Sequence, residues 1–199
     1  MLRYASLTLL AVPAIVAAAP SGELAQVQRH LQGVGSMTAN FEQSQGGKVA
    51  TGTLQLKRPG KVRFEYGRGE NMLLVSDGKA LTFIDYDVKQ VQRYPIGDNP
   101  LSILLNPNQD ISRFARVRSS TAGTLLVEAK DPKRPEYGTI TMAFAKVPSA
   151  PAGLMLQGWS VVDAQGKRTT IKLSNQRFNV PVADSAFRYR DPRARGPRG

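Results

Sequence analysis

The sequence contains no cysteine and a single histidine, and these two features exclude several kinds of chemistry. Without cysteine the chain forms no disulfide bond and offers no thiol for a lipid anchor. His30 is the only histidine, so we expect no zinc site, and its neighbours do not favour a hydrolytic triad. No Gly-Lys-Ser or Gly-Lys-Thr follows the glycines at the spacing of a phosphate-binding loop. We therefore expect no enzyme, no catalytic residue, no metal and no cofactor.

Acidic residues are also scarce, with 15 Asp and Glu against 27 Lys and Arg, which gives a formal net charge of +12. Such a balance favours anionic surfaces such as phospholipid headgroups, lipopolysaccharide or nucleic acid. Asp77, Asp85 and Asp87 are close enough in sequence to bind calcium, although carboxylates in such positions more often form turns.

Only one long apolar run is present, and it lies at the amino terminus. It extends from Leu7 to Val16, after a basic start at Arg3 and before Ala19-Pro20. This arrangement predicts a cleavable signal peptide over residues 1–19, and Pro13 disfavours the alternative of a retained membrane helix. We therefore expect an exported, soluble protein, for which nucleic acid is the least plausible of the anionic partners.

The chain after residue 19 is long enough for one domain with its own core, which we place at residues 20–190. Residues 191–199 combine arginine with proline and glycine and predict a disordered basic tail. Phe187 and Tyr189 are expected to close the last strand of the domain.

Residues 51–66 have the most regular pattern in the chain and predict a β-hairpin. Apolar side chains alternate on both sides of Arg58-Pro59-Gly60. A two-residue loop would turn the two apolar rows to opposite faces, so we predict an odd-length loop or a bulge, with Gly60 at positive φ. The alternating residues are Leu54, Leu56, Val62, Phe64 and Tyr66.

Arg58 shares the parity of the apolar row in the first strand of this hairpin. If that strand continues so far, the side chain points along the apolar face, at the mouth of whatever the face encloses. The alternative is a solvated turn arginine, which the pattern alone favours.

Two segments have helical spacing. Ser21 is a candidate cap for a helix with apolar positions at Leu24, Val27 and Leu31. A second, short helix is predicted to start at Asn99-Pro100 and to end before Pro107, with a further helical turn over residues 110–114. Its apolar residues are Leu101, Leu104 and Leu105, beside Ile103.

Strand patterns occupy most of the remaining chain. They predict an α+β fold in which a long antiparallel sheet curls and two or three helices cover its concave apolar face. The predicted strands, besides the hairpin, are residues 37–44, 72–75, 80–84, 89–94, 116–118, 125–129, 139–144, 154–163 and 169–178.

Several stretches together resemble the periplasmic outer-membrane lipoprotein carrier family, LolA. Their order and spacing match over residues 37–105, whereas residues 115–180 match only in strand pattern. The matching stretches are Met37-Thr38-Ala39-Asn40-Phe41-Glu42-Gln43, Gly52-Thr53-Leu54, Lys57-Arg58-Pro59-Gly60, Phe64-Glu65-Tyr66, Val75-Ser76-Asp77-Gly78-Lys79-Ala80-Leu81, Asp85-Tyr86-Asp87-Val88-Lys89-Gln90-Val91 and Asn99-Pro100, with Phe187 and Pro192 near the end.

The resemblance implies an incomplete, strongly curved antiparallel half-barrel with helices forming a lid over a hydrophobic cavity. It also implies a monomer that shields the acyl chains of lipoproteins in the periplasm. An inner-membrane lipoprotein-releasing ABC transporter would load the carrier, and an outer-membrane lipoprotein receptor would take the cargo. Arg58 matches the arginine that latches the lid in this family, and Phe64 and Thr82 fall where relatives often carry tryptophan inside the cup.

On this basis we assign residues to the lid and to the lining of the cavity, although each of them could equally be plain core. The lid residues are Leu24, Val27, Leu31, Leu101, Leu104 and Leu105. The lining residues are Met37, Phe41, Leu54, Leu56, Val62, Phe64, Tyr66, Leu81 and Phe83.

Two other functions are compatible with the sequence. A related exported carrier could transport a different lipid or a glycolipid. A module without transport activity could instead dock on anionic membrane or lipopolysaccharide through its basic surface.

Overall fold

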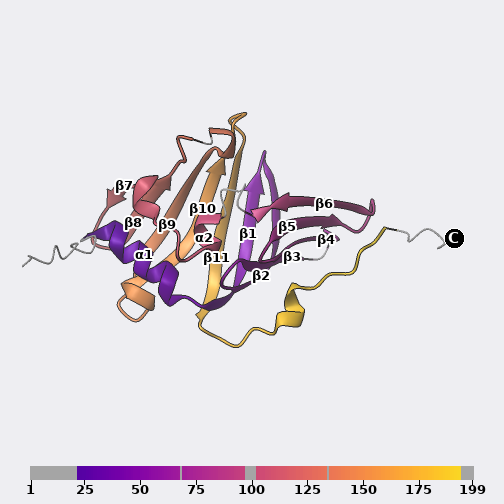
Figure 1. Cartoon of the computed structure of the whole chain (residues 1–199), viewed down its shortest axis with the longest axis horizontal. Coiled ribbons are helices and arrows are strands. Elements are labelled where there is room, and N and C mark those ends of the chain that lie inside the picture. Colours follow the sequence, from indigo (N-terminus) through magenta and orange to yellow (C-terminus); the bar gives the residue numbers. More distant parts are fainter. Residues whose placement is uncertain (1–21, 68, 97–101, 134, 194–199) are drawn as a thin grey trace, which may run out of the picture.

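The computed structural model describes residues 22–67, 69–96, 102–133 and 135–193. They form one open antiparallel sheet of eleven strands in the order β6-β5-β4-β3-β2-β1-β11-β10-β9-β8-β7 (Figure 1). The predicted signal peptide, Ser21, Leu101 and the start of the second helix lie outside the described residues, as do residues 194–199 of the predicted tail. The strands are β1 (Ser36–Gln45), β2 (Lys48–Lys57), β3 (Lys61–Tyr66), β4 (Met72–Asp77), β5 (Ala80–Asp85), β6 (Gln90–Pro95), β7 (Ala115–Ser120), β8 (Thr124–Ala129), β9 (Thr139–Lys146), β10 (Leu154–Val162) and β11 (Arg168–Phe178).

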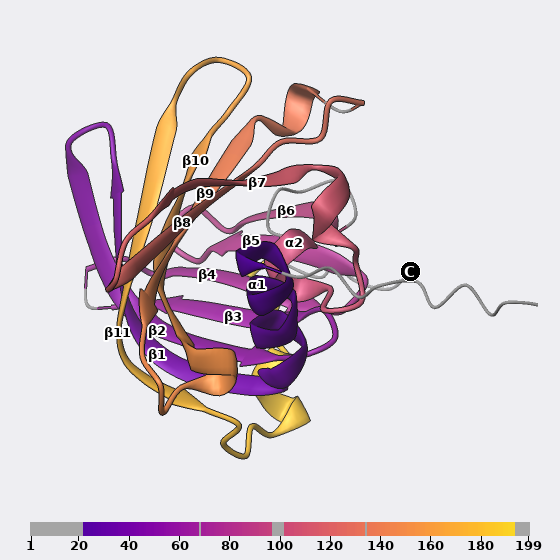
Figure 2. The same ribbon diagram turned by 90° about the vertical axis from the view of Figure 1, so that its left-hand side faces the viewer.

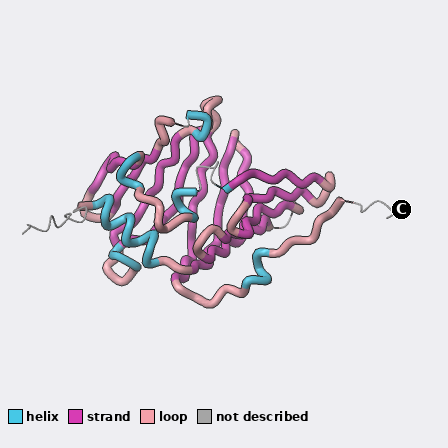
Figure 3. The backbone as a smooth tube through the Cα atoms, viewed as in Figure 1, coloured by secondary structure: helices cyan, strands magenta, loops and turns pink. Residues whose placement is uncertain are grey.

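The sheet curls but does not close into a barrel, because β6 and β7 remain its two edges. Figure 2 shows the curled sheet with the helices α1 (Glu23–Gly33) and α2 (Ser102–Leu105) on its concave side. Figure 3 shows that much more of the backbone is in strands than in helices. The predicted α+β half-barrel with a helical cover is therefore confirmed.

The β2–β3 hairpin has the predicted odd-length loop. Leu56 pairs with Val62 and Lys57 with Lys61, which leaves Arg58, Pro59 and Gly60 as a three-residue connection. Gly60 has a φ of 76°, in the left-handed region that glycine adopts without strain. This loop keeps both apolar rows on the concave face.

The helices differ in detail from the sequence expectation. Helix α1 begins at Glu23 after Gly22, which makes no side-chain capping bond. The turn predicted over residues 110–114 is the 3-10 helix η2 (Ile111–Arg113), whose backbone the Asp110 side chain caps through the Ser112 N–H.

Two of the three aspartates considered for calcium act as turn formers. The Asp77 carboxylate accepts hydrogen bonds from the backbone N–H groups of Lys79 and Ala80. Asp85 accepts in the same way from Asp87 and from the residue after it. Local backbone donors therefore occupy the carboxylates of Asp77 and Asp85, as is usual in turns, whereas the Asp87 carboxylate accepts from Asn71 Nδ2 at 2.6 Å.

The prediction that Phe187 and Tyr189 close the last strand is wrong. Strand β11 ends at Phe178, and the next residue, Asn179, has a φ of 55°, which turns the chain away from the sheet. Phe187 then ends the 3-10 helix η5 (Asp184–Phe187) and packs on the convex face against Leu73, Val75 and Ile84.

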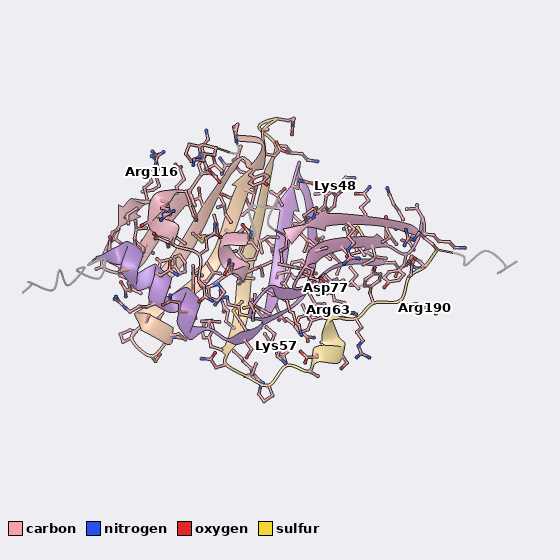
Figure 4. The ribbon with its side chains drawn as sticks, viewed as in Figure 1. Lys48, Lys57, Arg63, Asp77, Arg116 and Arg190 are labelled. Atoms are coloured by element: carbon pink, nitrogen blue, oxygen red, sulfur yellow. The ribbon has the colours of Figure 1, made fainter. Side chains whose placement is uncertain are left out.

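We call residues 179–190 the strap, because this segment runs across the convex face along β3 and β4 (yellow in Figure 1). Asp184 accepts hydrogen bonds from the ammonium groups of Lys57 (2.8 Å) and Lys61 (2.9 Å). Arg63 donates to the carbonyls of Ala186 and Arg188. Figure 4 shows Lys57 and Arg63 beside the strap.

Candidate functional site

The concave face of the sheet and the two helices enclose one apolar interior, which we call the cup. The predicted lining residues of β1, β2 and β3 lie in it and are almost fully buried, while Tyr66 is partly buried against the same cluster. Leu81 also belongs to this interior, whereas Phe83 is half-buried and lines none of the hollows described below. The buried lining residues are Met37, Phe41, Leu54, Leu56, Val62, Phe64 and Leu81.

Thr82 does not lie inside the cup. It is buried, but it pairs with Val75, and its neighbours in sequence point to the other face. Leu81 belongs to the cup, so the alternation of β5 puts Thr82 on the convex face. The expectation that Thr82 occupies a tryptophan position within the cup is therefore wrong.

The tryptophan of the cup comes instead from β10. A β-bulge between Leu156 and Gly158 shifts the pairing of β10 with β9, and Trp159 then faces Phe64 across the interior. A regular strand with Leu154 and Leu156 inside would direct Trp159 outward. Gly158 has a φ of 151°, and a Cβ there would lie 2.1 Å from the Ile171 carbonyl oxygen, so the bulge requires glycine.

The helices that carry the predicted lid residues lie directly on this interior. Val27 and Leu31 of α1 are fully buried, Leu24 packs at the edge of the core, and Leu104 and Leu105 of α2 are buried beside them. Side chains fill the space so closely that only a void of about 30 Å³ remains between the lid and the Phe64 and Trp159 rings. The cup is therefore closed and filled by its own residues.

Arg58 reaches from the hairpin turn into this void and connects both helices. Its Nε and Nη2 atoms donate to the Leu104 carbonyl at 3.0 and 2.8 Å. Its Nη1 atom donates to the carbonyls of Leu31 and Val34, the latter at 2.6 Å. The Arg58 N–H also bonds to the Gly35 carbonyl at 2.8 Å, which fixes the backbone of the turn.

These acceptors explain why a single arginine suits the position. The last carbonyls of a helix have no partner within the helix, and Leu31 and Val34 lie at the end of α1 while Leu104 lies at the end of α2. Burial lowers the pKa of Arg58 to about 10, so the guanidinium remains charged at neutral pH. A charged donor thus joins the carboxyl ends of both helices.

His30 is a buried neighbour of Arg58 that the sequence analysis did not assign to the site. It lies on the buried face of α1, lines the same void as Arg58, and is 2% exposed. Its Nδ1 atom donates to the Pro151 carbonyl at 2.9 Å, and its ring packs edge-on against Phe144 and Phe178. Burial lowers the pKa of His30, and the nearby Arg58 charge lowers it further. The sequence did contain a signal, because His30 follows Val27 by three residues and such a spacing places both on the same face of a helix.

The two helices are attached very differently. Helix α1 is held to the turn before β10 by His30 and by Gln26, whose Nε2 donates to the Ala152 carbonyl at 2.9 Å. Glu23 binds Lys146 (3.0 Å) and Ser120, which fixes the other end of the helix. Helix α2, by contrast, has two described polar attachments to the sheet. Arg58 donates to the Leu104 carbonyl, and the Gly60 N–H donates to the Leu105 carbonyl.

A larger hollow of about 560 Å³ lies on the other side of α2 from the void. Leu105 lines both spaces, so this short helix is the wall between them. Apolar side chains such as Ile96, Phe114 and Ile140 line the hollow together with the hairpin turn.

Comparison with known proteins identifies the family. The model described as "Outer membrane lipoprotein carrier protein LolA" matches residues 32–190. This chain belongs to the LolA family. The outer-membrane lipoprotein carrier protein of Chromobacterium violaceum is 29% identical over 201 residues, covering 96% of this chain and 94% of the relative. That of Xanthomonas oryzae pv. oryzae is 30% identical over 200 residues, covering 94% and 92%.

Among solved structures, an uncharacterised conserved protein from Thermus thermophilus aligns with a TM-score of 0.53 and 11% identity. The alignment covers 83% of this chain and 92% of that one, and it shows a shared fold. Within the part of this LolA-family chain that the structure describes, no helix is long and apolar enough to cross a membrane.

Proposed function

We propose that the protein is a periplasmic carrier that encloses the acyl chains of lipoproteins in the cup and exchanges them between membrane-bound partners. The observation that carries this proposal is the Arg58 bridge, because it joins two helices over an apolar interior through bonds that break without unfolding the sheet. Membership of the LolA family supports the class of cargo.

In the proposed cycle, acyl chains replace the protein's own side chains in the cup. The empty cup is too small for cargo, since ligand pockets typically measure about 300–1,000 Å³ and this void measures about 30 Å³. Helix α2 therefore moves away from the sheet, and the hollow behind it provides space for that movement. Helix α1 keeps its separate attachments to β9 and to the turn before β10 throughout.

Burial of the acyl chains supplies the driving force. Each methylene removed from water contributes about 0.8 kcal/mol, so a long acyl chain stabilises the complex by roughly 10 kcal/mol before the costs of opening and ordering. The leucines of α2 compete for the same space, so the closed empty state and the loaded state remain close in free energy.

The proposed partners follow from the cargo. Because an exported carrier has no access to ATP, an inner-membrane lipoprotein-releasing ABC transporter hydrolyses ATP and loads the cup. An outer-membrane lipoprotein receptor then accepts the acyl chains. The carrier acts as a monomer without a cofactor and without catalysis, after removal of residues 1–19.

The test is mass spectrometry of lipids and proteins that co-purify with the chain from periplasm. We expect triacylated lipoproteins on the wild type, an altered amount on Arg58→Leu, and the wild-type amount on Arg63→Leu, which removes an arginine from the convex face. Glycolipid or free lipid in place of lipoprotein would indicate a carrier of another lipid. An empty protein that binds anionic vesicles only at low salt would indicate the docking module.

A further inference from the structure

Four aromatic side chains form a continuous row through the interior of the cup. The ring centroids of Trp159 and Phe64 are 6.1 Å apart, those of Phe64 and Phe41 are 5.3 Å apart, and those of Phe41 and Tyr66 are 5.2 Å apart. The planes of successive rings cross at 77°, 73° and 85°. Each contact is therefore edge to face, the arrangement that aromatic rings favour.

The row is fixed at both ends by features that side-chain rotation cannot easily change. At one end, the Tyr66 hydroxyl donates to Gln43 Oε1 at 2.8 Å. At the other, the bulge at Gly158 directs Trp159 into the cup. Phe41 lies so close to Gly52 that a Cβ there would be 2.7 Å from the ring, so this glycine provides the room for the row.

The two sides of the row differ in chemistry. On the side of the lid lies the void, lined by apolar residues such as Met37 and Leu56, which lie nearer the hairpin turn than Phe64, together with Arg58. At the far end of β1, on the same face, Gln43 is bonded to Tyr66 and Gln45 Nε2 donates to Thr169 Oγ1 at 2.5 Å. An acyl chain entering from the lid therefore meets flexible aliphatic side chains first and the aromatic row next, with bonded polar groups at the far end.

We propose that Phe64 and Trp159 form the floor of the cup and set the length of acyl chain that the carrier accepts. This inference rests on the proposed function and adds a specificity-determining pair to it. Met37 and Leu56 have rotamers that yield to cargo, whereas the interlocked rings keep their places. Methylenes beyond the floor remain outside the cup and gain no burial.

The experiment measures the affinity of the mature protein for synthetic triacylated lipopeptides that share one peptide and differ in acyl length by two methylenes at a time. Below the limit set by the floor, each buried methylene should strengthen binding about fourfold, the equivalent of about 0.8 kcal/mol. Above the limit the affinity of the wild type should level off. Trp159→Ala should move this limit to longer chains, so that each methylene added just beyond the wild-type limit again gains about fourfold.

Leu125→Ala is the matched control, because Leu125 is fully buried in the same core but belongs neither to the row nor to the lining of the void. It should leave the limit unchanged even if it lowers stability. Trp159 is the only tryptophan of the chain, so its emission gives a second readout in the wild type. Lipopeptides too short to reach the floor should leave that emission unchanged, and longer ones should shift it.

The outcomes are distinct. A limit that moves only in Trp159→Ala supports the floor. The same limit in the wild type and in Trp159→Ala overturns the floor while leaving the carrier function intact. Failure of the wild type to bind any lipopeptide, with a folded protein by circular dichroism, overturns both proposals.

Discussion

The guanidinium of Arg58 donates twice to a single acceptor, the carbonyl oxygen of Leu104. That oxygen belongs to α2, a four-residue helix, whereas the other two acceptors of Arg58 belong to the end of α1. Because α1 has further polar attachments to the sheet, loss of Arg58 should release α2 far more than α1.

Replacement of Arg58 by leucine tests this asymmetry. The variant leaves the Leu104 carbonyl without its charged donor, and we expect the closed state of α2 to lose about 3 kcal/mol. The Gly60 and Asn106 amides, whose acceptors are Leu105 and Ser102, should then exchange with deuterium about a hundredfold faster. Exchange at the Gln26 amide, in the first turn of α1, should change much less.

Arg63→Leu is the control for that measurement, since Arg63 donates to strap carbonyls on the convex face. It should leave exchange at Gly60 and Asn106 at the wild-type rate. An equal increase in the amide exchange rates of α1 and α2 in Arg58→Leu would contradict the asymmetry.

His30 predicts a pH dependence of stability. Its pKa in the folded protein lies below the ordinary value of 6.5, so the unfolded chain binds the proton more readily. The free energy of unfolding should therefore be highest above the ordinary histidine pKa of 6.5. It should fall as the pH decreases below that pKa, by at most about 1.4 kcal/mol per pH unit. The facing cation is Arg58, which opposes protonation of His30.

Urea unfolding of the wild type and of His30→Gln across this pH range measures the effect. We expect the variant to be less stable at neutral pH but to lack the decrease that begins near the ordinary histidine pKa of 6.5. A parallel decrease in both proteins would show that another group is responsible.

Phe187 on the strap should contribute to stability without affecting cargo. It is 5% exposed and packs against Leu73, Val75 and Ile84 on the face opposite the cup. We expect Phe187→Ala to lower the free energy of unfolding by about 3–5 kcal/mol, as for other buried aromatic truncations. Calorimetry should detect the loss, while the affinity for lipopeptide measured below the midpoint temperature remains that of the wild type. A large loss of affinity would show that the strap communicates with the cup.

Gly52 should not tolerate a side chain. A Cβ at this position would lie 2.1 Å from the Glu65 carbonyl oxygen and 2.7 Å from the Phe41 ring. We expect Gly52→Ala to destabilise the protein by about 3 kcal/mol, at the upper end of the cost of overpacking. Gly123→Ala, where no atom lies within 4 Å of the added carbon, is the control for thermal unfolding. Equal midpoints for the two variants would contradict this contact.

Much of the fold could be predicted because apolar residues alternate without a break through the β2–β3 hairpin. The parity of Leu54 and Leu56 against Val62 and Phe64 required an odd-length loop, and the hairpin has one. The prediction failed where backbone geometry changed the phase or direction of the chain. Asn179 turns the chain out of β11, and Phe187 consequently packs on the convex face instead of extending the sheet.

The site was predicted less completely for the same reason. Alternation identified the rows of β1 to β3, but the bulge at Gly158 reverses the parity of β10, so no periodic pattern predicts that Trp159 enters the cup. The partners of Arg58 are backbone carbonyls, which every residue possesses, so no sequence pattern could identify them. Thr82 shows that a position matched to a family need not keep the direction expected for its side chain.

The unpaired edges β6 and β7 have a consequence for the capacity of the cup. In a closed barrel, strand number and shear determine the radius, and widening it requires hydrogen bonds to break. An open sheet has no such constraint, because small changes in twist between neighbouring strands uncurl or tighten it with every ladder bond intact. We therefore expect the circumference of the cup to be elastic, even though the proposed floor fixes its depth.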